Sequence, residues 1–385
     1  MINLFQPALG KEELDLIEDV FESNWLGKGN YVKEFEKGFA NNLNTEEKHF
    51  LSTTSCTEAI FLASDLFEFN SEDEVIIPSI SFPSVGSAII SKGAKVVFCD
   101  VDKRSLNVRV EDIKPKITQN TKAVFITHYG GVSCDMDPII KLCEEYNIKV
   151  IEDSACAVRS FYKGKACGTI GDMGMWSLDA MKTLCTADGG MIYIKDLKLR
   201  DIAEEQLYLG LPLKQKSGID SSTEGNASWW EFEMTRPGRR AIMNNVTGAM
   251  GCAQLKKLDG FINRRKEIYN RYLNELSKLN WIEVPPIAKY ENESSYYFFW
   301  IQTEYRNELA KYLLDNGVYT TFRYWPLHKV ELFSEFKIEG EYPNTDYISE
   351  HTLNLPLHQN LTDSDMDKII NLISEFHVVV VQMLL

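Results

Sequence analysis

Three groups of residues have types and spacings that suit chemistry on a phosphate-bearing ligand. The first is the hydroxyl-rich run TTSCT at residues 53–57, which leads directly into a helix-like segment. The start of a helix offers N–H groups without intrahelical acceptors and the positive end of the helix dipole, so this turn is suited to hold a phosphate. Serine and threonine are also ordinary helix caps, and the run by itself fits either role.

The second group centres on Asp153, which ends the apolar run KVIED. A carboxylate buried at the end of such a run loses its hydration and needs a partner. The protonated ring nitrogen of a ligand would be a suitable partner. A helix cap or a salt bridge would satisfy the same carboxylate, and this feature alone leaves those roles open.

The third group centres on Lys182, which lies between Ser177 and a polar turn that ends in Gly189 and Gly190. An isolated lysine after a strand is more often a solvated surface residue. Here the two glycines let the backbone approach a ligand closely. A lysine held in such a site loses its proton more readily and can form a Schiff base with an aldehyde.

Taken together, the three groups meet the requirements of pyridoxal 5'-phosphate (PLP). This cofactor needs a cradle for its phosphate, a carboxylate for its pyridinium nitrogen and a lysine for its aldehyde. The carboxylate keeps the ring nitrogen protonated, so that electrons from the substrate Cα can flow into the ring. The combination is more specific than any one of its parts.

The order of predicted elements can bring these groups to one place. Short β-branched runs alternate with helix-like segments over residues 48–194, which predicts a three-layer α/β domain with a mainly parallel sheet. Ligands of such sheets collect at the carboxyl ends of the strands. The predicted strands are residues 49–54, 74–78, 95–102, 122–128, 148–153, 173–178 and 189–194, and the predicted helices are 57–65, 82–91, 110–117 and 136–146.

The rest of the chain has a different character. Residues 209–240 predict a long loop, and residues 243–276 predict a long helix that could link two lobes. A helix over 306–316, a core strand over 296–300 and a last helix over 363–376 indicate a smaller α+β domain. We therefore expect domains at 1–250 and 251–385. The apolar end VVVVQMLL is expected to be a last strand or an added tail, because it is too short to cross a bilayer.

Composition narrows the partners and the compartment. The 385 residues include 41 basic and 56 acidic side chains, a net charge of −15, which argues against non-specific nucleic-acid binding and a polybasic membrane surface. The eight cysteines occur singly, without the paired spacing of a zinc site, so we expect no metal and a reduced, cytoplasmic setting. No secretion signal or membrane-length apolar run is present in this sequence.

The run from Glu152 to Gly190 resembles the core signature of the DegT/DnrJ/EryC1/StrS family of PLP-dependent sugar aminotransferases. That signature reads E-D-x-A-x-A, G-x-x-G-D, S-F-x-x-x-K and G-G. The similarity extends over nearly the whole chain and includes NWLGKGNYVKEFEKGF near the start and FRYWPLH near the end. It implies the fold of aspartate aminotransferase (fold type I), with a mostly parallel seven-stranded sheet and a smaller C-terminal α+β domain.

The resemblance also implies roles for single residues. Lys182 would form the Schiff base and move the proton between the substrate and the cofactor, which alternates between PLP and pyridoxamine phosphate. Asp153 would pair with the ring nitrogen, and Ala155 and Phe82 would pack on the two ring faces. The remaining cofactor contacts are assigned to Ser55, Cys56, Thr57, Cys156 and Ser177, and the substrate contacts to Trp25, Lys28, Gly29, His128, Arg239, Tyr324 and His328.

Several of these assignments have structural alternatives. His128 could be a satisfied histidine at a strand end, and His328 could likewise serve the fold. Trp229 and Trp230 could stack on a nucleotide base or bury a subunit contact. A homodimer with shared active sites is implied, and Arg240 stands where the neighbouring subunit's phosphate ligand is usually asparagine.

Three other positions depart from the family pattern. Cys56 replaces a glycine and narrows the approach to the phosphate. Cys156 replaces a glutamine, which puts a hydrogen bond to the cofactor's phenolic oxygen in doubt. Leu178 replaces a phenylalanine and is a packing change.

The retained Lys182 favours transamination over dehydration, because family members with histidine there act as dehydrases. We expect transfer of the amino group of L-glutamate to a keto-sugar on a nucleoside diphosphate, most often a 4-keto-6-deoxyhexose and otherwise a 3-keto sugar. The alternatives are a cyclitol ketone as substrate, or a PLP-bound regulatory protein without turnover. A Rossmann oxidoreductase is disfavoured, since TTSCTE stands where G-x-G-x-x-G would follow the first strand.

Overall fold

The computed structural model describes residues 1–211, 233–287 and 292–384. Its helices are α1 (Lys11–Glu22), α2 (Asn30–Asn42), α3 (Cys56–Leu66), α4 (Pro83–Ile90), α5 (Val110–Ile113), α6 (Met136–Tyr146), α7 (Leu197–Leu207), α8 (Asn245–Leu276), α9 (Arg306–Asp315), α10 (Pro343–His351) and α11 (Asp363–Leu384). Its strands are β1 (Phe50–Thr53), β2 (Glu74–Pro78), β3 (Lys95–Cys99), β4 (Thr121–Thr127), β5 (Lys149–Asp153), β6 (Phe161–Tyr162), β7 (Lys165–Ala166), β8 (Met173–Ser177), β9 (Gly190–Ile194), β10 (Asn292–Glu293), β11 (Phe299–Gln302) and β12 (Thr352–Leu355).

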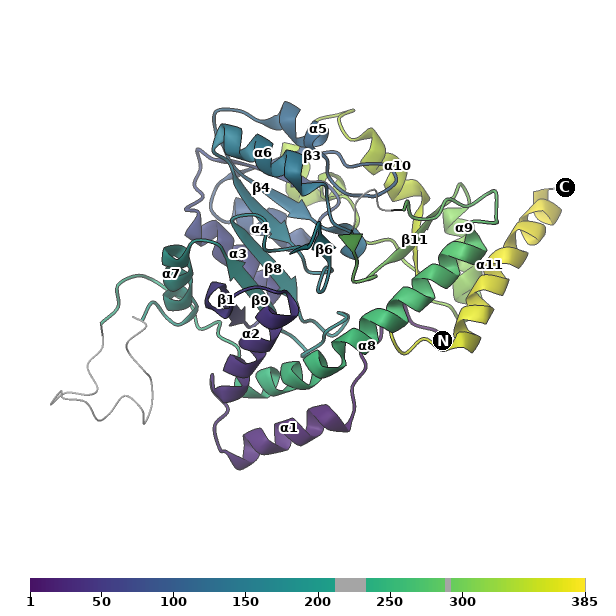
Figure 1. Ribbon diagram of the computed structural model, residues 1–385. Helices are drawn as coiled ribbons and strands as arrows, with labels where there is room; N and C mark the ends of the chain where they lie inside the picture. Colours follow the sequence, from purple (N-terminus) through teal and green to yellow (C-terminus); the bar gives the residue numbers. More distant parts are fainter. Residues whose placement is uncertain (212–232, 288–291, 385) are drawn as a thin grey trace.

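A seven-stranded sheet with the order β1-β9-β8-β5-β4-β2-β3 forms the centre of the molecule (Figure 1). Strand β9 is antiparallel to both of its neighbours, and the strands from β8 to β3 are parallel to one another. Because β1 and β8 both run opposite to β9, β1 has the same direction as the parallel strands. The mainly parallel sheet predicted from the sequence is confirmed.

Helices cover both faces of this sheet. Successive side chains of a strand point to opposite faces, and both sets are buried here. Val75 and Phe125 pack in one core cluster with residues of α3, α4 and α7. Ile76 and Val124, on the opposite face, pack in a second cluster with residues of α5 and α6. Strands that are buried on both faces read as continuous apolar runs, which explains why they were recognisable in the sequence.

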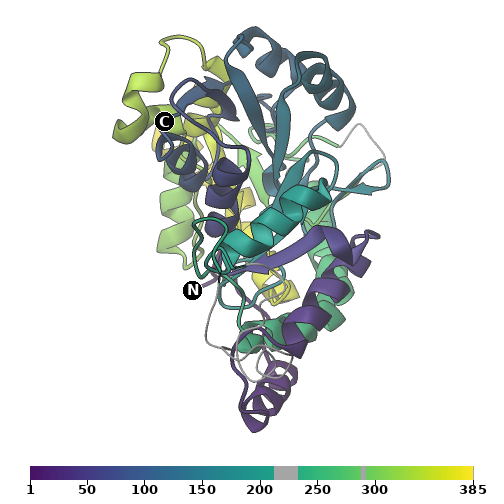
Figure 2. The ribbon, with the colours of Figure 1, turned by 90° about the vertical axis from the view of Figure 1, so that its left-hand side faces the viewer.

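The long helix α8 connects this layered unit with the C-terminal elements (Figures 1 and 2). Its N-terminal half packs with α1 and α2, and α1 projects from one end of the molecule. Its C-terminal half, including Ile268 and Tyr272, joins a core cluster with β11, β12, α9 and α11. The domain boundary that we expect near residue 250 falls inside α8 and stays a proposal.

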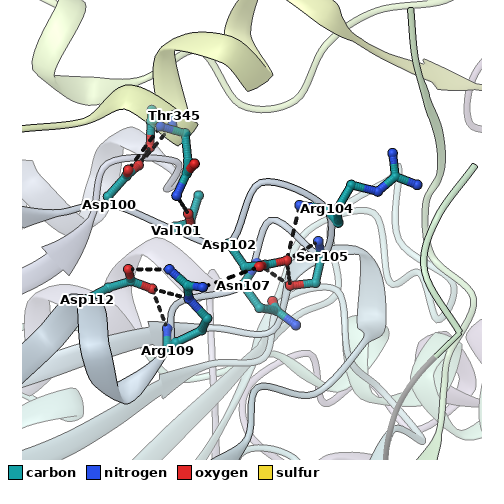
Figure 3. Close-up of polar contacts among 10 residues, drawn as sticks. Asp100, Val101, Asp102, Arg104, Ser105, Asn107, Arg109, Asp112 and Thr345 are labelled. Carbon is teal, nitrogen blue, oxygen red and sulfur yellow. Dashed lines mark hydrogen bonds and ion pairs between the residues drawn. The ribbon is translucent and has the colours of Figure 1, made fainter. Parts of the chain in front are cut away.

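A polar network after β3 ties the large sheet to α10 (Figure 3). The Asp100 carboxylate accepts the N–H groups of Asn344 and Thr345, at 3.0 and 2.8 Å, and the Thr345 hydroxyl, at 2.7 Å. These N–H groups belong to the first turn of α10 and have no acceptor inside their own helix. Asp100 therefore caps the helix from another part of the chain.

The chain end differs from expectation. The run that begins at Val378 was predicted as a last strand or an added tail. The strand is wrong, because α11 continues through Leu384. A helix that is already nucleated adds each residue for one hydrogen bond, which favours extension over a new, unpaired strand.

Candidate active site

The three sequence-predicted groups lie at one edge of the sheet. The parallel strands end at this edge, so the residues after β1, β5 and β8 meet there. The start of α3 follows β1, Asp153 ends β5, and Lys182 lies in the turn after β8. Phe82, after β2, directly precedes α4 at the same edge.

The start of α3 has N–H donors that could hold an anion. Ser55 is the cap of this helix, and its Oγ accepts the Glu58 N–H at 3.1 Å. The first-turn N–H groups of Cys56 and Thr57 therefore stay available for a ligand. Ser177 pairs with Gly190 across β8 and β9. A β-carbon on Gly190 would lie 2.8 Å from the Cys56 nitrogen, so Ser177 and the helix start are close neighbours.

Asp153 is a buried carboxyl group at the end of β5. Its side chain is 4% exposed, and Oδ1 accepts the Ala155 N–H at 3.0 Å. Burial raises the pKa of this carboxyl above its ordinary value, although the Ala155 N–H and the positive charge of Lys182 act in the opposite direction. A protonated ring nitrogen would supply the stabilisation that burial removes.

Lys182 is positioned by the turn around Asp179. The Lys182 N–H donates to the Asp179 carbonyl and the Met181 N–H donates to the Asp179 carboxylate, both at 2.9 Å. The Lys182 Nζ lies 3.7 Å from the Cys156 Sγ and 4.9 Å from the centre of the Tyr297 ring. Burial lowers the pKa of this amine, but neighbours that include Cys156 and Tyr297 outweigh it, and the net pKa is well above the ordinary value. The readier loss of the proton that the sequence analysis expected for Lys182 is therefore wrong for this amine.

Aromatic rings and a thiol surround this lysine. The Tyr324 hydroxyl is 3.8 Å from the Cys156 Sγ, and the Phe82 ring meets the Tyr324 ring edge-on at 5.7 Å between centres. Burial raises the pKa of the Cys156 thiol, so the thiol is neutral at physiological pH. The structure thus brings Phe82, Cys156 and Tyr324 together beside the lysine, and their contacts with cofactor and substrate stay predictions.

Tyr297 is a site residue that the sequence analysis missed. It lies in the aromatic run 296–300, which was interpreted as a core strand, but β11 begins only at Phe299. The Tyr297 hydroxyl donates to the Met181 carbonyl at 3.3 Å, so the ring supports the lysine turn. A uniform run of aromatic residues carries no signal that separates the one at the site from those in the core.

The ring nitrogens of His128 and His328 contact other residues of the fold. His128 is fully buried, with Nε2 at 2.9 Å from the Glu152 carboxylate and Nδ1 accepting the Cys134 N–H at 3.1 Å. Glu152 and Asp153 are adjacent in β5, so their side chains point to opposite faces of the sheet. His128 therefore lies on the face opposite to Asp153, as a satisfied histidine at a strand end.

His328 likewise serves the fold. Its Nδ1 is 2.6 Å from the Ser79 hydroxyl, and its Nε2 is 3.3 Å from the Asp346 carboxylate. The ring stacks on Tyr342 at 4.5 Å between centres. These contacts fix the segment that follows Tyr324, and a contact with substrate stays a prediction.

The residues assigned to the substrate side near the N-terminus contact other parts of this chain. Lys28 pairs with the Glu36 carboxylate at 3.1 Å, and the Trp25 indole N–H donates to the Lys28 carbonyl at 3.0 Å. A β-carbon on Gly29 would meet the Asn245 side chain at 2.8 Å, which explains the glycine. These contacts hold the segment before α2 against α8.

The two adjacent arginines differ in their partners. Arg239 pairs with Glu58 and Asp65 of α3, at 2.5 and 2.9 Å. Arg240 is exposed, and its guanidinium lies over the Tyr208 ring at 5.6 Å. Trp229 and Trp230 lie outside the described residues.

Comparison with known proteins identifies the family. The family model described as "DegT/DnrJ/EryC1/StrS aminotransferase family" matches residues 7–374. The chain belongs to this aminotransferase family. A dTDP-4-dehydro-2,3,6-trideoxy-D-glucose 4-aminotransferase of Saccharopolyspora spinosa is 44% identical over 95% of this chain and 94% of its own length. A GDP-perosamine synthase of Escherichia coli O157:H7 is 31% identical over 98% of both chains.

Solved structures agree with this assignment. The aminotransferase TlmJ from Streptoalloteichus hindustanus is 42% identical and superposes with a TM-score of 0.92 over 99% of this chain and 100% of its own. The family is PLP-dependent. A structure described as "Putative sugar aminotransferase Spr1654 from Streptococcus pneumoniae, PLP-form" is 24% identical and superposes with a TM-score of 0.85 over 96% of both chains. Fold type I is thereby confirmed.

The residues of this aminotransferase fit the cofactor. The N–H groups of Cys56 and Thr57 at the start of α3 are suited to the phosphate, and Gly190 lets this backbone lie against β9, since a β-carbon there would be 2.8 Å from the Cys56 nitrogen. The buried Asp153 carboxyl is suited to the ring nitrogen. Lys182 lies at the same sheet edge, where it can hold the aldehyde. Within the described ranges no cluster of three potential metal ligands occurs, and no helix is long and apolar enough to span a membrane.

Proposed function

We propose that this aminotransferase moves the amino group of L-glutamate to a 4-keto-6-deoxyhexose carried on a nucleoside diphosphate. The observation that carries the reaction type is the convergence of Lys182, Asp153 and the start of α3 at one sheet edge. The sugar class is supported by the relative from Saccharopolyspora spinosa, whose name gives a dTDP-linked 4-keto sugar as its substrate.

Each group of this chain has a defined task in the reaction. Bound PLP supplies the electron sink that amino exchange requires. The N–H groups of Cys56 and Thr57 and the Ser177 hydroxyl would hold the phosphate, while Asp153 would keep a proton on the ring nitrogen. Lys182 would hold the cofactor's aldehyde carbon, and its Nζ would move the proton at the substrate carbon. Phe82 and Ala155 would pack on the two faces of the ring.

We further propose a cytoplasmic homodimer in which Arg240 completes the phosphate site of the partner subunit. The exposed guanidinium, held over the Tyr208 ring, supports this role because it has no carboxylate partner within the described part of its own chain. The eight cysteines are free, which supports a reducing compartment.

The test of this function has two parts. Borohydride reduction of the purified protein is expected to fix the cofactor to the peptide that contains Lys182, and Lys182→Ala is expected to abolish amino transfer. A panel of dTDP-, UDP- and GDP-linked 4-keto and 3-keto sugars with L-glutamate then identifies the acceptor by the mass of the aminated product. Full activity of Lys182→Ala would refute the mechanism. Turnover with a cyclitol ketone alone would show that the acceptor is a cyclitol and not a nucleotide-linked sugar. Absence of turnover with every ketone would indicate a regulatory protein.

A further inference from the structure

Arg323 lies beside the lysine site. It directly precedes Tyr324, whose hydroxyl is 3.8 Å from the Cys156 Sγ. Its Nη2 lies 3.5 Å from the Met181 Sδ, and Met181 directly precedes Lys182. Arg323 is thus joined to Lys182 from two directions, through Tyr324 and Cys156 and through Met181.

The backbone of Arg323 is held in place on both sides. Its N–H donates to the Asn354 Oδ1 at 2.8 Å, and its carbonyl accepts the Tyr129 hydroxyl. The Asn354 amide also donates to the Tyr129 hydroxyl oxygen at 3.2 Å. The start of the side chain is therefore fixed relative to the sheet, while the guanidinium at its end is partly exposed.

The guanidinium itself has no oxygen partner within the described residues. It lies over the Phe5 ring at 5.4 Å, and Phe5 stacks on Tyr297 at 5.3 Å with 14° between the ring planes. Every other arginine of the chain except Arg240 donates to a carboxylate, carbonyl or amide oxygen among the described residues. A planar fork of donors resting on aromatic rings is suited to bind a carboxylate with two parallel hydrogen bonds.

We propose that Arg323 binds a carboxylate of the amino-acid donor, an assignment that rests on the proposed transamination. The donor must bring its amino group to the position of Lys182, which places its carboxylates within reach of a long side chain anchored next to Tyr324. The chain as a whole carries a net charge of −15, so an anionic donor needs a local cation. Among the residues that the structure describes, Arg323 offers such a cation beside the turn that carries Lys182.

The test separates the two halves of the reaction. Arg323→Gln is expected to raise the half-saturating concentration of L-glutamate about 10- to 100-fold, measured by the cofactor's absorbance as it accepts the amino group. Starting from the pyridoxamine form, saturation with the keto-sugar is expected to stay unchanged. The half-saturating concentration of L-glutamate for Arg323→Lys should lie between those of the wild type and Arg323→Gln, because an ammonium group keeps the charge but not the planar pair of donors. Arg271→Gln, which removes a partly exposed arginine of α8 that pairs with Asp367 of α11, is the control.

L-Alanine identifies which carboxylate is bound, because it lacks the one in the side chain. Equal weakening of glutamate and alanine by Arg323→Gln assigns the α-carboxylate, and weakening of glutamate alone assigns the side-chain carboxylate. Unchanged saturation with both donors, or a loss confined to the nucleotide sugar, would overturn the proposal.

Binding of glutarate keeps this test independent of turnover. Calorimetry on the holoenzyme is expected to detect glutarate with the wild type and to find binding at least about 10-fold weaker with Arg323→Gln. If the wild type aminated none of the keto-sugars, the proposed function would fail while the glutarate comparison would still decide the role of Arg323. Equal glutarate affinity, or no glutarate binding to the wild type, would contradict that role.

Discussion

The α-carbon of Gly190 faces the start of α3 so closely that a β-carbon on it would lie 2.8 Å from the Cys56 nitrogen. Gly190 is also the cross-strand partner of Ser177. The missing side chain therefore lets the hydroxyl at the end of β8 and the free N–H groups of α3 approach one anion together. The cradle depends on backbone proximity, which only glycine permits here.

Gly190→Ala is accordingly expected to weaken PLP binding by at least about 10-fold, since the added methyl must displace the backbone that holds the phosphate. Equilibrium dialysis of the apoprotein against PLP measures this affinity. Gly260→Ala is the matched control, because a β-carbon at Gly260, inside α8, meets nothing within 4 Å. That change should leave the affinity unchanged and stabilise the fold by up to about 1 kcal/mol. Equal affinity of wild type and Gly190→Ala would contradict the cradle.

The sequence was informative where a pattern has one physical cause. Strands buried on both faces, such as β4, appear as apolar runs, and the direction of parallel strands then places Asp153 and Lys182 at one edge. The partners of side chains from distant segments have no such pattern. For His128 the sequence left a substrate contact and a structural role open, because its pairing with Glu152 is a tertiary contact. Tyr297 could not be told apart from its aromatic neighbours, because its approach to Lys182 is also a tertiary contact.

Asp153→Asn is expected to separate stability from activity. Burial raises the pKa of the Asp153 carboxyl, so the folded apoprotein is destabilised by its charge at every pH above that raised pKa. Asparagine removes the charge and can still accept the Ala155 N–H. We expect the free energy of unfolding of the apoprotein at pH 7.5 to rise, while amino transfer falls roughly 10²- to 10³-fold, as for other lost electrostatic partners. Denaturant unfolding measures the stability, and turnover measures the amino transfer. A lower free energy of unfolding for Asp153→Asn would contradict the destabilising effect of burial on the charged carboxylate.

His358 is expected to make the protein sensitive to mild acid. It is 4% exposed, and burial, with the nearby charge of Arg265 as a second cause, lowers its pKa from 6.5 to about 4. Between these two values the unfolded chain binds a proton that the folded chain excludes, so stability falls as the pH falls through this window. The shift corresponds to roughly 3 kcal/mol by pH 4.

His358→Gln should remove this part of the pH dependence. Urea unfolding at pH 7.5, 5.5 and 4.5 should give a flatter curve of unfolding free energy against pH for this variant than for the wild type. His351→Gln is the control, since His351 stacks on Tyr347 near the surface and is less enclosed. Parallel curves for wild type and His358→Gln would show that the buried ring does not govern acid stability.

The proposed sharing of active sites between subunits predicts complementation of two defective variants. Lys182→Ala lacks the cofactor attachment, and Arg240→Ala lacks the exposed guanidinium that we assign to the partner's phosphate. In a hybrid dimer one site would combine the intact Lys182 of one subunit with the intact Arg240 of the other. After denaturation and joint refolding of equal amounts, about half of the dimers are hybrids with one intact site each, so about a quarter of wild-type activity should return. If Arg240 instead served the site of its own chain, no hybrid dimer would hold an intact site. Hybrids isolated by two affinity tags would then be no more active per intact Lys182 than the Arg240→Ala homodimer.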